Sequence, residues 1–154
     1  MTRTELRDQL TVMLGGRAAE DITFHGEIST GASDDLERAS ELARQMVTRF
    51  GMSDRMGNLT YGRPLAGRFL QSPFANEERN YSDRTAEAID DEVHAMIQDS
   101  YEISRQILIN RHDDLQRIAR ELIKRETLDR SALEEILREG MMDDTTHRNA
   151  ISAA

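Results

Sequence analysis

One stretch of this sequence decides the fold: Ser29-Thr30-Gly31-Ala32-Ser33-Asp34-Asp35-Leu36-Glu37-Arg38-Ala39. It places two carboxylates, Asp34 and Asp35, in the opening turn of a helix that we expect to run from about Ser33 to Phe50. Apolar residues recur along this segment at helical intervals and form one stripe: Leu36, Ala39, Ala43, Met46, Val47 and Phe50. A helix start carries unpaired backbone N–H groups and the positive end of the helix dipole, which together stabilise an anion. A carboxylate held in this way can bind a metal ion, although Ser and Asp are also ordinary N-cap residues.

Further amphipathic helices are expected on both sides of this stretch. Thr2 and Glu5 have the spacing of a capping box at the start of the first of them. The expected helices are Thr2 to Leu14, Ser82 to Ile109, a helix after Asp113, and Ala132 to Arg138. The second would extend roughly 40 Å, which is long for a globular protein. The inward residues expected after Asp113 are Leu115, Ile118, Ala119, Leu122 and Ile123.

Between these helices the sequence is less regular. Ile22-Thr23-Phe24 is typical of a short strand or an extended connection, and residues 52–80, which hold both prolines, form an irregular central region. From Gly140 onward the helical pattern ends. We therefore expect an all-α helical bundle with one long helix, an irregular central loop region and at most a very short strand. It would be organised as one helical region over residues 1–139 and a disordered tail over 140–154.

The composition excludes several classes of protein. With a net charge of -9, the chain lacks the basic surface that nucleic-acid binding requires, and no nucleic-acid partner is expected. The single lysine, Lys124, lies in a helical pattern rather than after a glycine-rich turn, which excludes ATP binding of the P-loop type. The absence of cysteine excludes disulfides and thiolate zinc sites. No apolar run approaches the roughly 20 residues that cross a bilayer, so we expect this chain to be soluble.

The quoted stretch is one of several separated motifs that follow one another along the chain. The others are Leu14-Gly15-Gly16-Arg17-Ala18-Ala19-Glu20, Ala43-Arg44-Gln45-Met46-Val47-Thr48-Arg49-Phe50-Gly51-Met52-Ser53, Gly57-Asn58-Leu59-Thr60-Tyr61-Gly62, Tyr81-Ser82-Asp83-Arg84-Thr85-Ala86 and Lys124-Arg125-Glu126-Thr127-Leu128-Asp129. Together they resemble the peptidase domain of the FtsH-like ATP-dependent zinc metalloproteases, the M41 peptidases. The resemblance spans roughly Thr2 to Arg138, and motifs in the right order are far more specific than one short pattern.

The resemblance implies a zinc-dependent endopeptidase in which an Asp is the third zinc ligand. This role carries over to Asp35, which occupies the matching position in the sequence. Asp34 stands where the family more often has Asn. Because both carboxylates lie in the first helical turn, the residues alone leave open which of them would face the metal. The resemblance also places an H-E-x-x-H motif N-terminal to the matched region, and an ATPase module further upstream.

No H-E-x-x-H motif occurs in this chain. The motif needs two histidines one helical turn apart, with a Glu beside the first. The residues four positions after His25, His94, His112 and His147 are Ser29, Gln98, Gln116 and Ile151. Because catalytic zinc sites use three protein ligands, we expect no tight zinc binding and no peptidase activity from this chain alone. Zinc would bind only with the missing His ligands supplied, and His25 is interpreted as a polar loop residue rather than a substitute ligand.

Two functions remain open from the sequence. The first is the C-terminal portion of an FtsH-like metalloendopeptidase, which supplies Asp35 and helical support of the site for proteolysis of misfolded or membrane proteins. The second is a catalytically inactive remnant that acts as an oligomerisation or protein-interaction module. For the full-length family, the resemblance implies protein substrates, a homo-hexamer with an ATPase module that uses ATP, and membrane association on the cytoplasmic side. The upstream membrane helix of that family is not contained in this chain.

Overall fold

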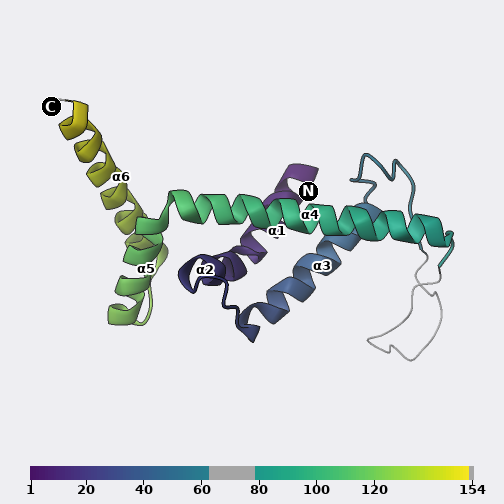
Figure 1. Cartoon of the computed structure of the whole chain (residues 1–154), viewed down its shortest axis with the longest axis horizontal. Helices are drawn as coiled ribbons and strands as arrows, with labels where there is room; N and C mark the ends of the chain where they lie inside the picture. The colour runs from purple at the N-terminus through teal and green to yellow at the C-terminus, as the bar shows by residue number, and fades with distance from the viewer. Residues whose placement is uncertain (63–78, 153–154) are drawn as a thin grey trace. The chain divides into compact units, whose positions relative to one another are not determined.

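The computed structural model describes residues 1–62 and 79–152. Within these residues the chain forms α-helices and one short 3-10 helix, and contains no strand. The elements are α1 (Arg3–Met13), α2 (Gly15–Thr23), η1 (Thr30–Ala32), α3 (Ser33–Thr48), α4 (Asp83–Asn110), α5 (His112–Arg125) and α6 (Arg130–Ser152) (Figure 1). They belong to two compact units, Met1–Arg105 and Gln106–Ala154. The prediction of an all-α fold is confirmed.

One local expectation is wrong, because Ile22 and Thr23 lie in the last turn of α2 rather than in a short strand. β-Branched residues favour strands only weakly, and packing of neighbouring residues readily overrides that preference. Here Ala18, in the middle of α2, is fully buried. Leu14 is both the C-cap of α1 and the N-cap of α2, so the two helices follow each other without a loop.

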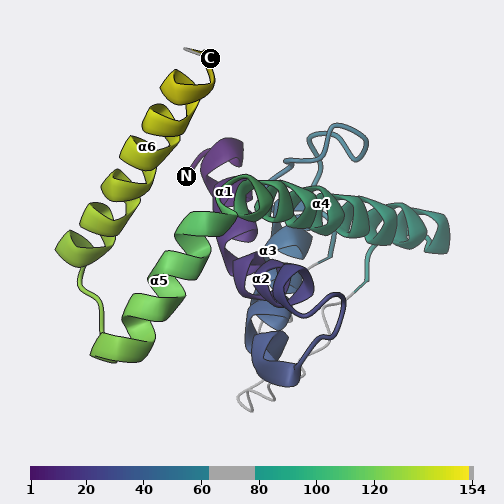
Figure 2. The ribbon, with the colours of Figure 1, turned by 60° about the vertical axis from the view of Figure 1, so that its left-hand side comes forward.

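Apolar residues, most of them from α1, α3 and α4, form the core of the first unit. The buried cluster consists of Leu6, Leu10, Leu14, Ala39, Ala43, Met46, Val47, Met56, Ile89, Val93 and Met96. α1 starts at the predicted capping box: Glu5 N–H donates to Thr2 Oγ1 at 3.2 Å, and Thr2 N–H donates to Glu5 Oε2 at 2.7 Å. Figures 1 and 2 both show α1 and α3 against α4, as this shared core requires.

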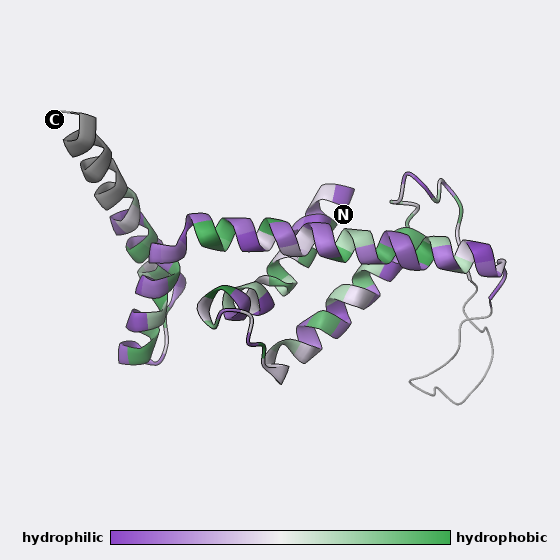
Figure 3. Ribbon diagram, in the orientation of Figure 1, coloured by the Kyte–Doolittle hydropathy of each residue, from purple (hydrophilic) through white to green (hydrophobic). Residues whose placement is uncertain are grey.

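α4 is the expected long helix, with 28 residues. It begins after Ser82, whose hydroxyl accepts a hydrogen bond from Thr85 N–H at 3.2 Å, as the predicted cap requires. Polar and apolar residues alternate around its surface, so that only one face enters the core (Figure 3). Among residues 1–62 and 79–152, no helix combines the length and the apolar character needed to span a membrane.

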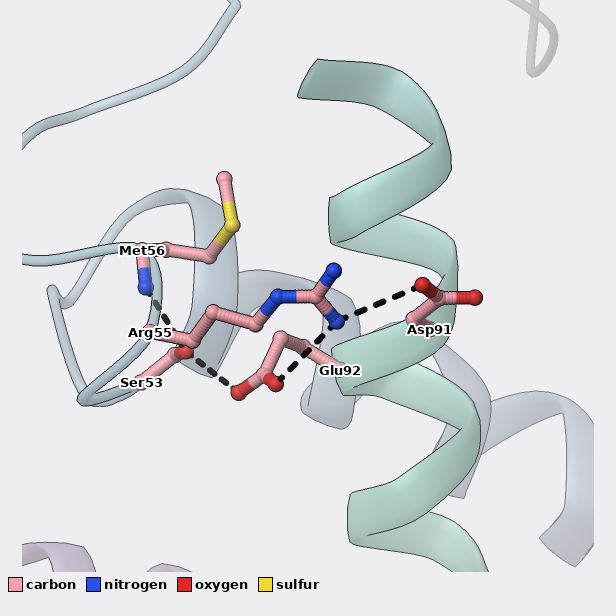
Figure 4. A network of polar contacts seen from close by, with 5 residues as sticks. All are labelled: Ser53, Arg55, Met56, Asp91 and Glu92. Atoms are coloured by element: carbon pink, nitrogen blue, oxygen red, sulfur yellow. Dashed lines mark hydrogen bonds and ion pairs between the residues drawn. The ribbon is translucent and has the colours of Figure 1, made fainter. Parts of the chain in front are cut away.

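A polar network holds the residues after α3 against α4 (Figure 4). Ser53 is buried; its hydroxyl donates to Glu92 Oε2 at 2.5 Å and accepts from Met56 N–H at 3.2 Å. Arg55 lies 3.3 Å from Asp91 and 3.9 Å from Glu92. The beginning of the irregular central region is therefore fixed to α4. Residues 63–78 of that region lie outside the described residues.

α5 and α6 pack against each other in the second unit. α6 begins after Asp129, whose Oδ1 accepts from Ala132 N–H at 2.8 Å, and it runs to Ser152 rather than ending near Arg138. The backbone is thus helical in the segment for which we expected disorder. That segment has no proline and one glycine, which costs a helix only about 1 kcal/mol. The division into a region over 1–139 and a tail over 140–154 stays a prediction.

The apolar face of α5 is less buried than its sequence pattern indicates. Leu122 and Ile123, which we expected to face inward, are 45% and 82% exposed. The buried apolar residue of the second unit is Ile136 on α6, within the part whose side chains the structure describes. A periodic pattern identifies an apolar face, but it does not show how much of that face the rest of the chain covers.

Gly140 is a point of close contact between α6 and α5. A Cβ atom at this position would lie 2.1 Å from Asp114 Oδ1 and 2.8 Å from Arg117 Nη1. Asp114 is buried, and its carboxylate accepts a hydrogen bond from Arg111, so it is not free to move away. We predict that Gly140→Val destabilises the second unit by about 1–3 kcal/mol through overpacking.

Hydrogen exchange of the α5 and α6 amides in the full chain measures this effect. Gly16→Ala is the matched control, because a Cβ there meets nothing within 4 Å. The control should be neutral or stabilising by up to about 1 kcal/mol. Unchanged exchange in Gly140→Val would contradict the prediction, because it would show that α5 and α6 can move apart without a loss of stability.

Candidate metal centre

Asp35 lies in the first turn of α3, as its sequence position predicts. Its side chain is half-buried, and no hydrogen bond or ion pair from residues 1–62 or 79–141 reaches its carboxylate. Asp34 differs: it is exposed, and its Oδ1 accepts from the Ser33 hydroxyl at 3.4 Å. Neither carboxylate acts as the N-cap of α3, because that position is Ala32. Partly buried carboxylates normally have a partner. Of the two, Asp35 is therefore the better candidate to bind a group that is not among the described residues.

The start of α3 depends on the 3-10 turn before it. Ser29 caps this turn, and its Oγ accepts from Gly31 N–H at 3.1 Å. η1 leads directly into α3 through Ala32, which is buried and has no side chain that could cap the helix. Ser29 therefore caps the short turn that leads into α3, the helix that carries Asp35.

Ser29 is held in turn by Glu20 of α2. Glu20 Oε2 accepts from Ser29 N–H at 3.2 Å, and Oε1 accepts from the Ser29 hydroxyl at 2.5 Å. The chain reverses direction between the two residues at His25 and Gly26, with φ angles of 54° and 92°. No sequence pattern identified this contact, because the partners are nine residues apart across a loop and do not share a helix face.

The contact between Glu20 and Ser29 should depend on pH. It lowers the pKa of Glu20 below 4.5, mainly through the hydrogen bond from the Ser29 hydroxyl and then through that from the Ser29 N–H. A carboxylate with a lower pKa in the folded state contributes stability above its unfolded pKa, and that stability is lost as the pH falls through the folded pKa. We therefore predict an intact contact at neutral pH and its loss below pH 4.5.

The amide chemical shift of Ser29, followed by NMR as the pH falls, measures this titration in the full chain. The expected inflection lies below pH 4.5 and disappears in Glu20→Gln. An inflection that survives in Glu20→Gln would assign the titration to another group and contradict the prediction.

The residues that the structure describes do not complete a zinc site. Among them, no group of three or more His, Cys, Asp or Glu side chains lies close enough together to hold a metal ion. His25 is exposed in the turn after α2, and His94 is exposed on α4. Asp35 fits zinc as a single carboxylate ligand, and catalytic zinc sites use three protein ligands.

Comparison with known proteins gives a consistent result. A sequence model of "Peptidase family M41" matches residues 1–136. The chain is 43% identical over 143 residues to the ATP-dependent zinc metalloprotease FtsH of Bacillus subtilis, which covers 93% of this chain and 22% of that protein. It is 40% identical over 154 residues to the protein of the same name from Pseudothermotoga lettingae, covering 100% of this chain and 24% of the relative. The ATP-dependent zinc metalloprotease FtsH 3 of Synechocystis is 44% identical over 137 residues, covering 88% and 22%. The chain therefore spans less than a quarter of the length of these curated relatives.

Proposed function

The chain belongs to peptidase family M41, and on this premise we propose that it supplies the aspartate ligand and the helical support of a zinc endopeptidase site. The family prediction made from the motifs is thereby confirmed. One observation carries the proposal: Asp35 is a half-buried carboxylate in the first turn of α3 without a partner among the described side chains. It is also the residue to which the family pattern assigns a ligand role.

The residues of this chain would hold and aim the ligand. Asp35 lies in the first turn of α3, at the positive end of the helix dipole, where the charge of a carboxylate is stabilised. Glu20 and Ser29 hold the 3-10 turn that leads into α3. Zinc, when bound, polarises a peptide carbonyl and activates a water molecule. This chain supplies no assigned general base.

The remaining parts of the enzyme are proposed from the family. Two imidazole ligands and a Glu base would come from an H-E-x-x-H segment on other polypeptide. An ATPase module would deliver misfolded or membrane proteins as substrates, and a membrane-associated homo-hexamer would be the assembly. The relatives' printed names support the ATP dependence and the zinc.

A chimera tests the proposal. The chain replaces the matched segment of the Bacillus subtilis relative, with which it shares 43% identity over 143 residues. We expect a purified chimera with about one zinc ion per subunit that degrades an unfolded protein such as casein when ATP is present. The unaltered relative is the positive control. A folded, assembled chimera without zinc or proteolysis would contradict the proposal.

The isolated chain gives the complementary prediction. Because the described residues offer no three-ligand set, we expect zinc to bind more weakly than micromolar, without peptidase activity. Isothermal titration measures the affinity directly. Submicromolar binding that Asp35→Ala abolishes would show that the chain builds a site by itself.

One observation favours the second function, an oligomerisation or interaction module. In the second unit, Ile107, Leu122 and Ile123 are large apolar residues that are 52%, 45% and 82% exposed. Exposed apolar residues can mark surfaces that bind other proteins. Size-exclusion chromatography with light scattering measures the assembly of the isolated chain. A stable hexamer would favour this function over the first.

A further inference from the structure

Asp21 joins α2 to α4. Its Oδ2 accepts from the Tyr101 hydroxyl at 3.0 Å and from Arg105 Nε at 3.3 Å. The side chains of Asp21 and Arg105 are 26% and 38% exposed, so the contact is only partly open to water. Tyr101 is 80 positions and Arg105 is 84 positions after Asp21 in the sequence, and no sequence motif identifies the contact.

The chemistry of the contact makes it persistent at neutral pH. Burial, followed by the hydrogen bond to Asp21, raises the pKa of Tyr101 above 10.0, so the hydroxyl remains a donor. Arg105 supplies the opposite charge to the Asp21 carboxylate. Hydrogen bonds to a charged partner are stronger and more directional than neutral ones.

α2 also touches α4 at its other end. A Cβ at Gly15 would lie 3.7 Å from Ser104 Oγ, and Ser104 is buried. Between these two contacts lies Ala18, which has no exposed surface. α2, a helix of nine residues, therefore contacts α4 near both of its ends. Its last turn presents Glu20 to Ser29, so the orientation of α2 determines where Ser29 is held.

We propose that Tyr101 and Arg105 are positioning residues for the zinc site, acting through Asp21. The contact sets the orientation of α2, Glu20 of α2 holds Ser29, and Ser29 caps the turn η1 that leads into the helix carrying Asp35. This inference rests on the proposed role of Asp35 as a zinc ligand. It assigns a role in metal binding to two residues of α4 that are far from Asp35 in the sequence.

Hydrogen exchange of the full chain provides the first readout. Tyr101→Phe removes one hydrogen bond and keeps the ring, while Asp21→Asn removes the charge and keeps the shape. Both should increase the exchange of amides 29–36 by about threefold or more. Tyr81→Phe is the matched control, because it removes a hydroxyl that is not part of this contact, and it should leave these amides unchanged.

Zinc affinity in the chimera provides the second readout. Chelator competition should show zinc bound about threefold to thirtyfold more weakly in Tyr101→Phe and in Asp21→Asn. The visible spectrum of the cobalt(II)-substituted chimera should shift in the same variants.

The outcomes separate the two proposals. Asp35→Asn should lose zinc; if it retains zinc, the proposed function fails. If Asp35→Asn loses zinc while Tyr101→Phe and Asp21→Asn bind it as tightly as the unaltered chimera, the positioning role is overturned and the ligand role stands. Faster exchange without a change in zinc affinity would also overturn it.

Discussion

Asp35→Ala in the chimera is expected to abolish both zinc retention and proteolysis, whereas Asp34→Ala leaves both close to the unaltered level. The difference follows from the environment of the two carboxylates. Asp35 is half-buried without a described partner, while Asp34 is exposed and accepts a hydrogen bond from its neighbour Ser33. Loss of a residue that only orients a ligand typically costs 10–100-fold in affinity or activity, so loss of a ligand should cost at least about 100-fold.

Zinc content by elemental analysis and casein degradation by gel assay measure the two effects. Circular dichroism and light scattering establish that the variants fold and assemble like the unaltered chimera, so that a loss of zinc reports on coordination. The reverse result, with zinc lost in Asp34→Ala and kept in Asp35→Ala, would assign the ligand to the neighbouring carboxylate. Retention of zinc in both variants would remove α3 from the coordination shell.

Leu10→Ala is expected to destabilise the first unit by about 3–5 kcal/mol, a large part of the stability of a small domain. Leu10 has no exposed surface and belongs to the cluster that joins α1, α3 and α4. Its truncation removes buried apolar area and leaves a cavity that rigid neighbouring helices cannot fill. Because α3 carries Asp35 and packs on α1, the same change should also weaken the metal site in the chimera.

Val12→Ala on the same helix is the matched control. Val12 is 78% exposed, so its truncation should change the stability by less than about 0.5 kcal/mol. Urea unfolding of the full chain, followed by exchange of the α1 and α3 amides, measures both variants. Equal effects at the two positions would show that α1 does not pack as the structure describes.

The sequence predicts well those features that local patterns determine. The apolar stripe from Leu36 onward identifies α3, and the spacing of Thr2 and Glu5 identifies the start of α1. The placement of Asp35 in the first turn of a helix follows from the same pattern. These features depend on residues within a few positions of each other, so a single sequence contains all the information they need.

Contacts across loops and between distant helices could not be predicted in this way. Glu20 meets Ser29 only because the chain reverses at residues 25 and 26, and Asp21 meets Tyr101 only because α2 lies on α4. α6 was expected to end too early, since a fading apolar pattern does not by itself stop a helix that contains no proline. The exposure of Ile123 likewise depends on tertiary packing, which periodicity does not specify.

A zinc-edge anomalous difference map of the crystallised chimera tests the ligand role of Asp35 most directly. We predict a peak about 2.0–2.2 Å from a carboxylate oxygen of Asp35, with nitrogen ligands from the segment that the relative contributes. A peak at a zinc site from which the Asp35 carboxylate is absent, with that side chain directed into solvent, would contradict the account.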